Sequence, residues 1–466
     1  MNRPPDPPGT DAAPPAPVAG AGAGASPGAW YTHLVALVVD VGPEGARIRR
    51  NFSYLIADRV VRLSIALVVN VWLARYLGVE RLGLMSFAQS VIVLFAVFAQ
   101  LGLETILVRD LVRRPTDAPG LIGTALGIRL AGAFVTLACS FAAVLFLRHG
   151  DRLSLVMVLI FSTMAFSQVF DVIEHWFQSR STLGPLVVAR TSASLVAAAA
   201  KVIAILMHAS LPVIAGVLAG EAALSSLALV VAYRLRAEAP RAWRFHRAEL
   251  AELLRASWPL FLNSVAIVIS VRVDQMILTS MHGPRANGIY AASQRLTEVI
   301  YYIPVAVLAA ANPALLRTHH EDPVAYERRL QRLFSALALG GVAIAIGVSV
   351  LSGPIIRILF GAAYAEAAPV LAIQVWTAPM LFLGVAQTNW FIANGRQTGL
   401  LVRSAVAAAL SLVLNFMLVP AWGPRGAAIT MLVSQTVAQV LLNACFAETR
   451  PLFRMHMRAF LPVGRR

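Results

Sequence analysis

Uncharged apolar runs of about twenty residues recur along most of the chain. Leu153 to Phe170 contains no charged residue, and Val202 to Gly220 contains no titratable residue apart from His208. A helix of about 20 apolar residues crosses the hydrocarbon core of a bilayer, and a helix satisfies its own backbone there. A β-barrel would instead show alternating segments of about 10 residues, which this chain lacks. The pattern therefore predicts an all-α membrane protein.

Glycine, proline and polar turn residues divide the apolar stretches into about twelve transmembrane helices. The predicted spans are residues 52–74, 83–107, 120–147, 153–178, 185–207, 211–233, 257–280, 287–314, 333–352, 369–393, 398–419 and 426–446.

A long polar loop separates six predicted spans from six others. Gly78, Gly83 and Gln89 follow the first span, and the same residue types recur at the same spacing 205 residues later, after the seventh. Duplicated helical bundles are typical of transporters whose substrate site lies between the repeats. We therefore expect two six-helix lobes around a central cavity. The predicted units are a disordered Pro/Ala/Gly-rich cytoplasmic tail at 1–50, an N-terminal lobe at 51–233, a cytoplasmic linker at 234–256, a C-terminal lobe at 257–446 and a basic cytoplasmic tail at 447–466.

Arginine supplies nearly all of the positive charge, since Lys201 is the only lysine. With the N-terminus in the cytoplasm, 24 arginines fall in cytoplasmic segments and seven on the opposite side. That asymmetry follows the positive-inside rule. We expect a multi-pass protein of the cell inner membrane with both termini in the cytoplasm. Its basic loops would meet anionic membrane lipids, not nucleic acid.

Motifs of soluble catalysis are missing from the sequence. There is no G-x-x-x-x-G-K-[ST], H-E-x-x-H or G-x-S-x-G, and the two cysteines suggest neither a disulfide framework nor a metal site. We expect no cofactor, no metal and no enzymatic activity, so transport is the favoured function. A membrane-embedded glycan polymerase or ligase is an alternative, but such an enzyme would carry a large outer loop. The longest outer loop expected here is about 353–368.

Basic residues inside the predicted spans point to the substrate. A charge at a helix centre costs at least ~2.5 kcal/mol on insertion scales, so a deep one should face a polar cavity. Arginine also matches phosphate geometry bidentately, and the surplus of deep bases favours an anionic substrate. A cavity for cationic drugs would be acidic. Snorkelling near a helix end is the alternative for Arg59 and for Arg403. The predicted cavity cations are Arg59, Arg62, Arg129, Arg190, Lys201, Arg272 and Arg295.

Three carboxylates in the spans are candidates for ion coupling. Glu298 comes first because it lies near mid-span and shares a helix face with Tyr290 and Gln294. Asp274 and Asp171 follow. A buried carboxylate takes up a proton or ligates sodium. A structural ion pair between Glu298 and Arg295 is an equally weighted alternative.

Several short segments, in this order and spacing, resemble one known family. They are Ala74 to Gln89, Leu101 to Asp110, Ser257 to Leu262, Asp274 to Leu278, Gly288 to Leu296, Leu359 to Gly361 with Tyr364, and Val419–Pro420 leading to Gly423 and Gly426 to Ala428. Over roughly 51–446 the chain resembles the polysaccharide-transport, or oligosaccharide flippase, family of the multidrug/oligosaccharidyl-lipid/polysaccharide (MOP) exporter superfamily. The first 50 residues have no counterpart in that pattern.

The resemblance implies two six-helix lobes that form a V around a central cavity. It implies a flippase that moves an undecaprenyl-diphosphate-linked oligosaccharide, such as an O-antigen, exopolysaccharide or capsule repeat unit, by alternating access. The implied partners are that lipid-linked anionic oligosaccharide, membrane lipids, and polysaccharide polymerase and chain-length machinery. A multidrug or metabolite antiporter of the same superfamily is the main alternative. The motifs fix neither the glycan nor the coupling ion.

Overall fold

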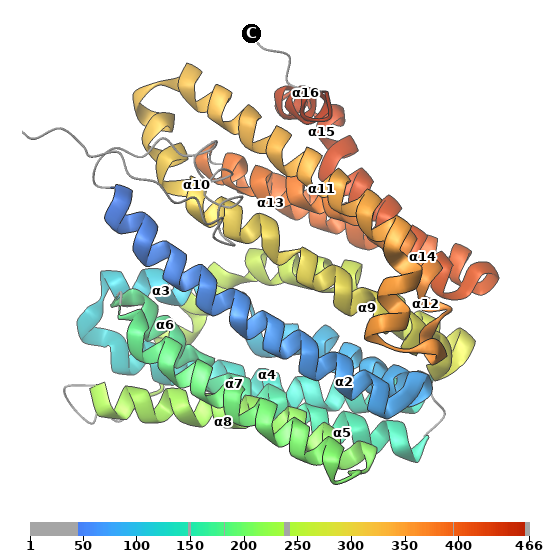
Figure 1. Ribbon diagram of the computed structural model, residues 1–466. Helices are drawn as coiled ribbons and strands as arrows, with labels where there is room; N and C mark the ends of the chain where they lie inside the picture. Colours follow the sequence, from blue (N-terminus) through green and yellow to red (C-terminus); the bar gives the residue numbers. More distant parts are fainter. Residues whose placement is uncertain (1–44, 148–150, 181, 237–242, 395, 462–466) are drawn as a thin grey trace, which may run out of the picture.

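The computed structural model describes residues 45–147, 151–180, 182–236, 243–394 and 396–461, and for residues 45–66 it describes the backbone alone. The described residues form helices and turns without strands, as the apolar pattern predicts (Figure 1). Most of the predicted tail at 1–50 lies outside them. The long helices are α2 (Gly45–Gln100), α4 (Ala118–Leu147), α5 (Arg152–Gln168), α7 (Leu183–Leu206), α8 (Leu211–Arg236), α9 (Arg247–Ile300), α10 (Tyr302–Glu321), α11 (Pro323–Leu359), α13 (Thr377–Ala393) and α14 (Gln397–Thr436). Shorter helices are α3 (Leu103–Arg113), α6 (Val172–Ser179), α12 (Ala367–Gln374), α15 (Leu442–Cys445) and α16 (Arg450–Ala459), and a π-helical turn, η4, covers Val437–Leu441.

Nine helical stretches in the described part of the chain are long and apolar enough to span a membrane. The protein is therefore a multi-pass membrane protein. Three of the nine correspond to pairs of predicted spans, because α2, α9 and α14 each run through a glycine with non-helical backbone angles. The count of twelve membrane crossings stays a prediction.

The helix α9 folds back on itself at Gly283. The side chains of Gln275 and Gln294 hydrogen-bond, although residues 19 apart in a straight helix lie about 28 Å from each other. Gly283 has φ 78° and ψ 177°, and Gly78 in α2 has φ 73° and ψ 172°. Glycine adopts this positive φ readily because it has no Cβ. The nearly equal angles support the internal repeat that the sequence predicts.

The two repeat-related hairpins pack backbone against backbone. A Cβ at Gly83 would lie 1.8 Å from the carbonyl oxygen of Pro284, and a Cβ at Gly288 would lie 1.9 Å from that of Val79. Asn287 Nδ2 donates to the carbonyl of Gly83 at 2.8 Å. Each hairpin thus presents its glycine to the other, which is the close approach that small residues permit between membrane helices.

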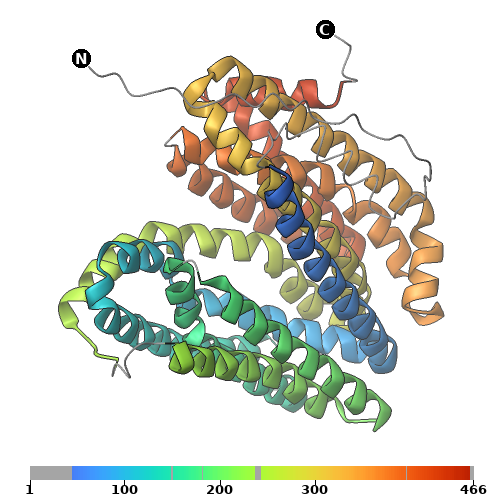
Figure 2. The same cartoon turned by 60° about the vertical axis from the view of Figure 1, so that its left-hand side comes forward.

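Two lobes meet at one end of the bundle and separate at the other (Figures 1 and 2). We call the end with Gly78, Gly283 and Gly423 the glycine end. There one continuous core joins α2, α5 and α8 to α9, α11, α12 and α14. Tyr364 donates to the carbonyl of Ala74 at 2.7 Å across the same junction.

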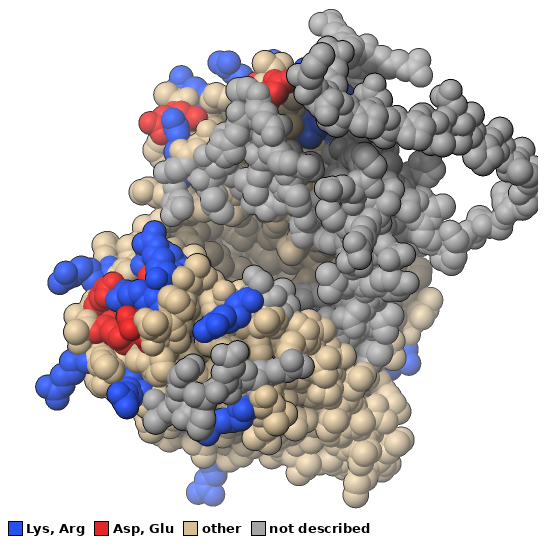
Figure 3. All heavy atoms as spheres, turned by 90° about the vertical axis from the view of Figure 1, so that its left-hand side faces the viewer, with Lys and Arg blue, Asp and Glu red and all other residues tan. Residues whose placement is uncertain are grey.

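At the opposite end, which we call the arginine end, the cores are separate. One core contains only α3, α4, α6, α7 and α8 of the first lobe, and another contains only α10, α11, α13, η4 and α16 of the second. Figure 3 looks onto this end, where a hollow lies between the lobes and Lys and Arg side chains gather beside it. The arrangement is a V that opens at the arginine end, as the resemblance implies.

The segment of α9 before Gly283 packs against the first lobe, although most of it belongs to the predicted second lobe. Its start is fixed by the hydrogen bond from Arg244 N to the carbonyl of Pro119 at 3.1 Å. Thr124 Oγ1 donates to Glu249 at 3.2 Å, and Arg114 pairs with Glu252 at 2.7 Å. The predicted linker at 234–256 therefore ends in a helix that bridges the lobes at the arginine end.

We predict that Gly288→Ala weakens the joint between the hairpins, because its Cβ has no room against the Val79 carbonyl. Overpacking of this kind costs about 1–3 kcal/mol. Thermal unfolding of the purified protein in detergent measures the loss. The matched control is Gly216→Ala in α8, where a Cβ meets nothing within 4 Å. Equal melting temperatures for the two variants would contradict the proposed joint.

Candidate functional site

A polar cavity of about 90 Å³ lies where the two hairpins cross. We call it the interlobe cavity. Three helical segments line it: α9 before Gly283, α9 after Gly283, and α2 after Gly78. The segment of α2 before Gly78 lies beside it, since Arg295 donates to the carbonyl of Asn70. Its lining residues are Ser86, Gln89, Ser90, Val93, Arg272, Gln275, Ala291, Gln294, Arg295 and Glu298.

Two guanidinium groups and one carboxylate line this cavity. Arg272 Nη2 lies 3.3 Å from Glu298 Oε1. Gln294 Nε2 donates to the same carboxylate oxygen at 3.3 Å. Arg295 Nη1 donates to the carbonyl of Asn70 at 3.4 Å. Among the described lining residues the charge is therefore positive by one.

Glu298 forms an ion pair in the structure, but its partner is not the arginine that the sequence suggests. Sequence spacing paired Glu298 with Arg295, three residues away on the same helix, but the structure pairs it with Arg272 on the other arm of the hairpin. The reason is the fold-back at Gly283, which brings residues 26 apart into contact. Arg295 extends toward α2 instead.

Amide side chains connect the two hairpins inside the cavity. Ser90 Oγ donates to Gln275 Oε1 at 2.7 Å, and Gln275 in turn hydrogen-bonds Gln294. Among these three residues, only Gln294 was identified from the sequence, and Ser90 and Gln275 were not. The internal repeat gave a sequence signal for this site, because Gln89 and Gln294 occupy equivalent positions in the two halves and both line the cavity.

Asp274 is buried beside the cavity but does not line it. It accepts hydrogen bonds from the Tyr290 hydroxyl and, at 2.7 Å, from the Gln275 backbone N–H. Tyr290 also contacts the sulfur of Met431. This carboxylate is already well partnered and has no open side toward the hollow between the lobes.

A second charged cluster lies within the first lobe. Arg129 donates to the carbonyl of Gln168 at 3.1 Å and lies 3.2 Å from His175 Nε2. Arg190 pairs with Asp171 at 3.2 Å and also with Glu174. Two arginines face Asp171, Glu174 and the neighbouring Glu104, so this cluster has no surplus of positive charge. It is separate from the interlobe cavity.

Among the remaining predicted cations, Lys201 falls outside both groups. Lys201 Nζ pairs with Glu221 at 2.6 Å between α7 and α8, with the lysine side chain only 10% exposed. The side chains of Arg59 and Arg62 are not among those the structure describes. Of the seven predicted cavity cations, Arg272 and Arg295 are therefore the two that line the interlobe cavity in the described residues.

No group of three His, Cys, Asp or Glu side chains within the described ranges is placed to hold a metal ion. Cys139 and Cys445 are both free thiols.

The sequence profile of one family covers more than half of the chain. It is described as "polysaccharide biosynthesis protein" and matches residues 48–319, which include both glycine hairpins and the whole interlobe cavity. The chain belongs to this family. No curated protein sequence matches the chain.

Solved structures similar to this family member are membrane transporters. One is a multidrug resistance MATE family transporter of the MOP superfamily in an inward-facing conformation, with TM-score 0.69, 15% identity, and coverage of 85% of this chain and 96% of that one. Another is the lipid II flippase MurJ in an inward closed conformation, with TM-score 0.69, 13% identity, and coverage of 88% and 90%. A third is a MOP superfamily transporter from Pyrococcus furiosus, described as having a binding pocket of reversed polarity that suggests a different function (TM-score 0.56, 16% identity, coverage of 85% and 96%). This member of the polysaccharide biosynthesis protein family therefore has the MOP transporter fold.

We predict that Lys201 and Glu221 form a structural pair. Lys201→Met leaves Glu221 without its partner and should destabilise the protein by about 1–3 kcal/mol. The double variant Lys201→Met/Glu221→Leu should regain most of that loss, because an apolar pair replaces the ion pair. Thermal unfolding in detergent compares the three proteins. A stable single variant with impaired transport would instead assign Lys201 to the substrate.

Proposed function

We propose that this protein is a flippase that moves an undecaprenyl-diphosphate-linked anionic oligosaccharide, an O-antigen, exopolysaccharide or capsule repeat unit, across the inner membrane by alternating access. The observation that carries the proposal is the interlobe cavity, where two arginines face one carboxylate. Arginine presents a planar fork of donors that fits phosphate oxygens. A diphosphate bridging Arg272 and Arg295 would place one of its two negative charges at each guanidinium.

The charge of the interlobe cavity distinguishes a flippase for an anionic glycan from a multidrug antiporter. A cationic drug entering the interlobe cavity would meet a net positive charge in a medium of low dielectric constant, where like charges repel strongly. The family membership, which concerns polysaccharide biosynthesis, favours the same choice. A polymerase or ligase would need a large outer loop. The described connection between α11 and α12 at the glycine end is only Phe360–Glu366.

The interlobe cavity suits a phosphate group and not a sugar chain. At about 90 Å³ it holds little more than a few water molecules. The glycan would therefore occupy the hollow between the lobes at the arginine end. If the arginine end faces the cytoplasm, as the positive-inside rule suggests, the V is open on the side where lipid-linked glycans are assembled.

Glu298 remains the first candidate for ion coupling in this proposal. A phosphate that binds Arg272 competes with Glu298 for the same guanidinium. Once displaced, the carboxylate would lose its ion pair and could take up a proton or sodium ion. Asp171 and Asp274 rank below it because Arg190 pairs with the first and Tyr290 hydrogen-bonds the second.

Replacing Arg272 tests the phosphate-binding assignment. Arg272→Ala should lower glycan export by about tenfold or more, since hydrogen bonds to charged groups each contribute about 1.5–3 kcal/mol. Arg272→Lys should keep part of the activity, because the charge persists while the bidentate fork is lost. Export is measured as surface polysaccharide in a complemented deletion strain. The control is Arg285→Ala, which removes an exposed arginine paired with the exposed Glu366. Normal export by Arg272→Ala at equal protein levels would refute the assignment.

Glu298→Gln tests coupling. In proteoliposomes the variant should still move the lipid-linked glycan but lose its dependence on pH or on sodium, because an amide neither titrates nor carries charge. The matched variant is Glu221→Gln, which alters a carboxylate outside the interlobe cavity. Unchanged ion dependence in Glu298→Gln would mean that coupling runs through another group.

Membrane orientation is tested by single cysteines in a Cys139→Ala/Cys445→Ala background. Arg247→Cys lies at the arginine end and Arg285→Cys at the glycine end, and both native side chains are exposed. An impermeant maleimide added to intact cells, with the outer membrane made permeable, should label Arg285→Cys alone. Labelling of Arg247→Cys instead would invert the topology.

A further inference from the structure

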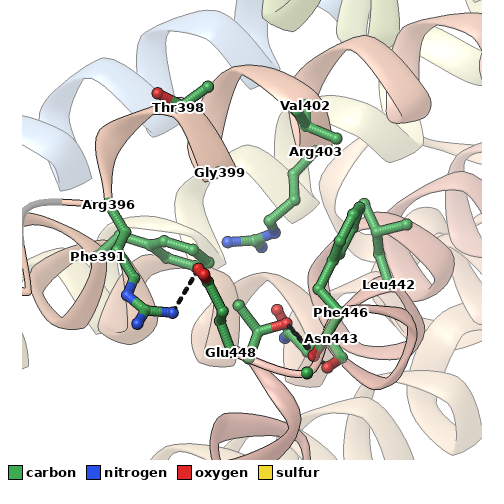
Figure 4. A pocket seen from close by; sticks show the side chains of 12 residues that line it. Phe391, Arg396, Thr398, Gly399, Val402, Arg403, Leu442, Asn443, Phe446 and Glu448 are labelled. Carbon is green, nitrogen blue, oxygen red and sulfur yellow. Dashed lines mark hydrogen bonds and ion pairs between the residues drawn. The ribbon is translucent and has the colours of Figure 1, made fainter.

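A second cavity, of about 490 Å³, lies at the arginine end of the second lobe (Figure 4). We call it the C-terminal cavity. It is enclosed by the end of α13, the start of α14, and the segment that joins α15 to α16. None of its lining residues belongs to the interlobe cavity. Transport as proposed above therefore does not require it.

Arg403 points into this cavity with its guanidinium above the ring of Phe391 (Figure 4). Arg403 is only 7% exposed, so its side chain does not snorkel to the membrane surface as its place near a helix end suggests. Arg403 Nε donates to the carbonyl of Ala438 at 2.8 Å, and Nη2 donates to Gln439. Within the described residues no carboxylate pairs with it. Burying a cation without an anion is costly, so the cavity is suited to an anion.

The backbone around Arg403 is built to hold it there. Ala438 and Gln439 belong to the π-helical turn η4, whose altered hydrogen bonding frees a carbonyl for the guanidinium. Single π-turns within helices occur frequently at functional sites. The first turn of α14 also lines the cavity at Thr398 and Gly399, so the positive N-terminal end of the α14 segment that precedes Gly423 faces it.

One acid stands at the mouth of the cavity. Glu448 pairs with Arg396 at 2.6 Å, and the two side chains are 70% and 39% exposed. An exposed pair of this kind contributes little stability, so an incoming anion can displace the carboxylate from Arg396. Arg396 would then join Arg403 in binding the anion.

Apart from Asn443 and Thr449, the remaining side chains that line the cavity are apolar. Val402, Leu442 and Phe446 line the cavity, and Phe446 is about half exposed. Such walls do not suit a free, fully hydrated phosphate, but they suit the acyl chains that adjoin a lipid headgroup.

The neighbouring helix α16 adds positive charge. Leu452 and His456 dock it against the second lobe, while Arg450, Arg454 and Arg458 are exposed at four-residue spacing, which is one face of a helix. Burial, together with the charge of Arg403, lowers the pKa of His456 to about 3, so this side chain stays neutral beside the cavity. Basic helices at a membrane surface attract anionic lipids.

We propose that the C-terminal cavity binds the phosphate of an anionic phospholipid, with Arg403 and Arg396 as its cationic partners and with the acyl chains along Val402 and Phe446. The bound lipid would link α13 and α14 to the C-terminal segment.

The test compares three probes on the purified full-length protein in a neutral detergent. Dioctanoyl phosphatidylglycerol should raise the melting temperature and remain bound in native mass spectrometry. Dioctanoyl phosphatidylcholine should do neither, because its headgroup has no net charge. Inorganic phosphate at the same concentration should have no effect. Equal stabilisation by phosphatidylcholine would show that the net charge of the headgroup is not recognised. Equal stabilisation by inorganic phosphate would show that the acyl chains are not needed. Either result would overturn the proposal.

Two variants should change the affinity in opposite directions. Arg403→Gln should weaken phosphatidylglycerol binding at least about tenfold, since it loses a charge-assisted contact. Glu448→Gln should strengthen binding, because no carboxylate then competes for Arg396, and a folding defect would not produce that gain. Val402→Trp, which fills the apolar wall without changing the charge, should also weaken binding and covers the case in which Arg403→Gln does not fold.

Two controls locate the site. Arg425→Gln changes an exposed arginine at the glycine end, just beyond the break in α14 at Gly423, and should bind as the wild type does. Arg272→Gln should also bind normally, which separates the C-terminal cavity from the interlobe cavity. Loss of binding in Arg272→Gln, or wild-type binding in both Arg403→Gln and Val402→Trp, would overturn the proposal.

Discussion

The contact between two glycine hairpins organises the rest of this protein. Lipid tails are as apolar as leucine, so apolar burial drives membrane helices together only weakly, and close backbone packing has to hold them. Gly83 and Gly288 allow the α2 and α9 hairpins to approach until each backbone touches the other. That contact joins the lobes at the glycine end, leaves them apart at the arginine end, and brings together the segments of α2 and α9 that line the interlobe cavity. A rocking motion of the lobes would therefore turn about this contact.

The cost of charge in the membrane explains how the other polar groups are arranged. Most deep charges have a nearby opposite charge, as Arg190 has in Glu174 and Lys201 in Glu221. Asp274 and Arg129 have hydrogen bonds with neutral groups in place of an ion pair. Two cavities among the described residues depart from that balance through a surplus of arginine. One is the interlobe cavity with its additional arginine, and the other is the C-terminal cavity around Arg403. Both departures have the same sign, and in both we infer a phosphate as the missing partner.

Much of the fold was predictable because a bilayer imposes simple rules on a sequence. The apolar runs predicted the helices, and the repeat of Gly78, Gly83 and Gln89 supported two duplicated lobes with a site between them. Pairing was less predictable, because helix periodicity describes one helix at a time. It placed Glu298 beside Arg295, whereas the fold-back at Gly283 brings Arg272 to Glu298. Arg403 shows the same limit, since its place near a helix end suggested snorkelling while α13 and the C-terminal segment bury it.

Transport of a lipid diphosphate in a purified system directly tests whether this protein is a flippase for lipid-linked glycans. The protein would be reconstituted into liposomes with a fluorescent undecaprenyl-diphosphate oligosaccharide, and an impermeant quencher would report the rate at which the label changes leaflet. A cationic dye in parallel liposomes would report drug transport. We predict that the protein accelerates movement of the lipid diphosphate well above the protein-free rate and leaves the dye unmoved, and this result would support a lipid-diphosphate flippase. Transport of the dye, with the lipid diphosphate moving no faster than in empty liposomes, would contradict it.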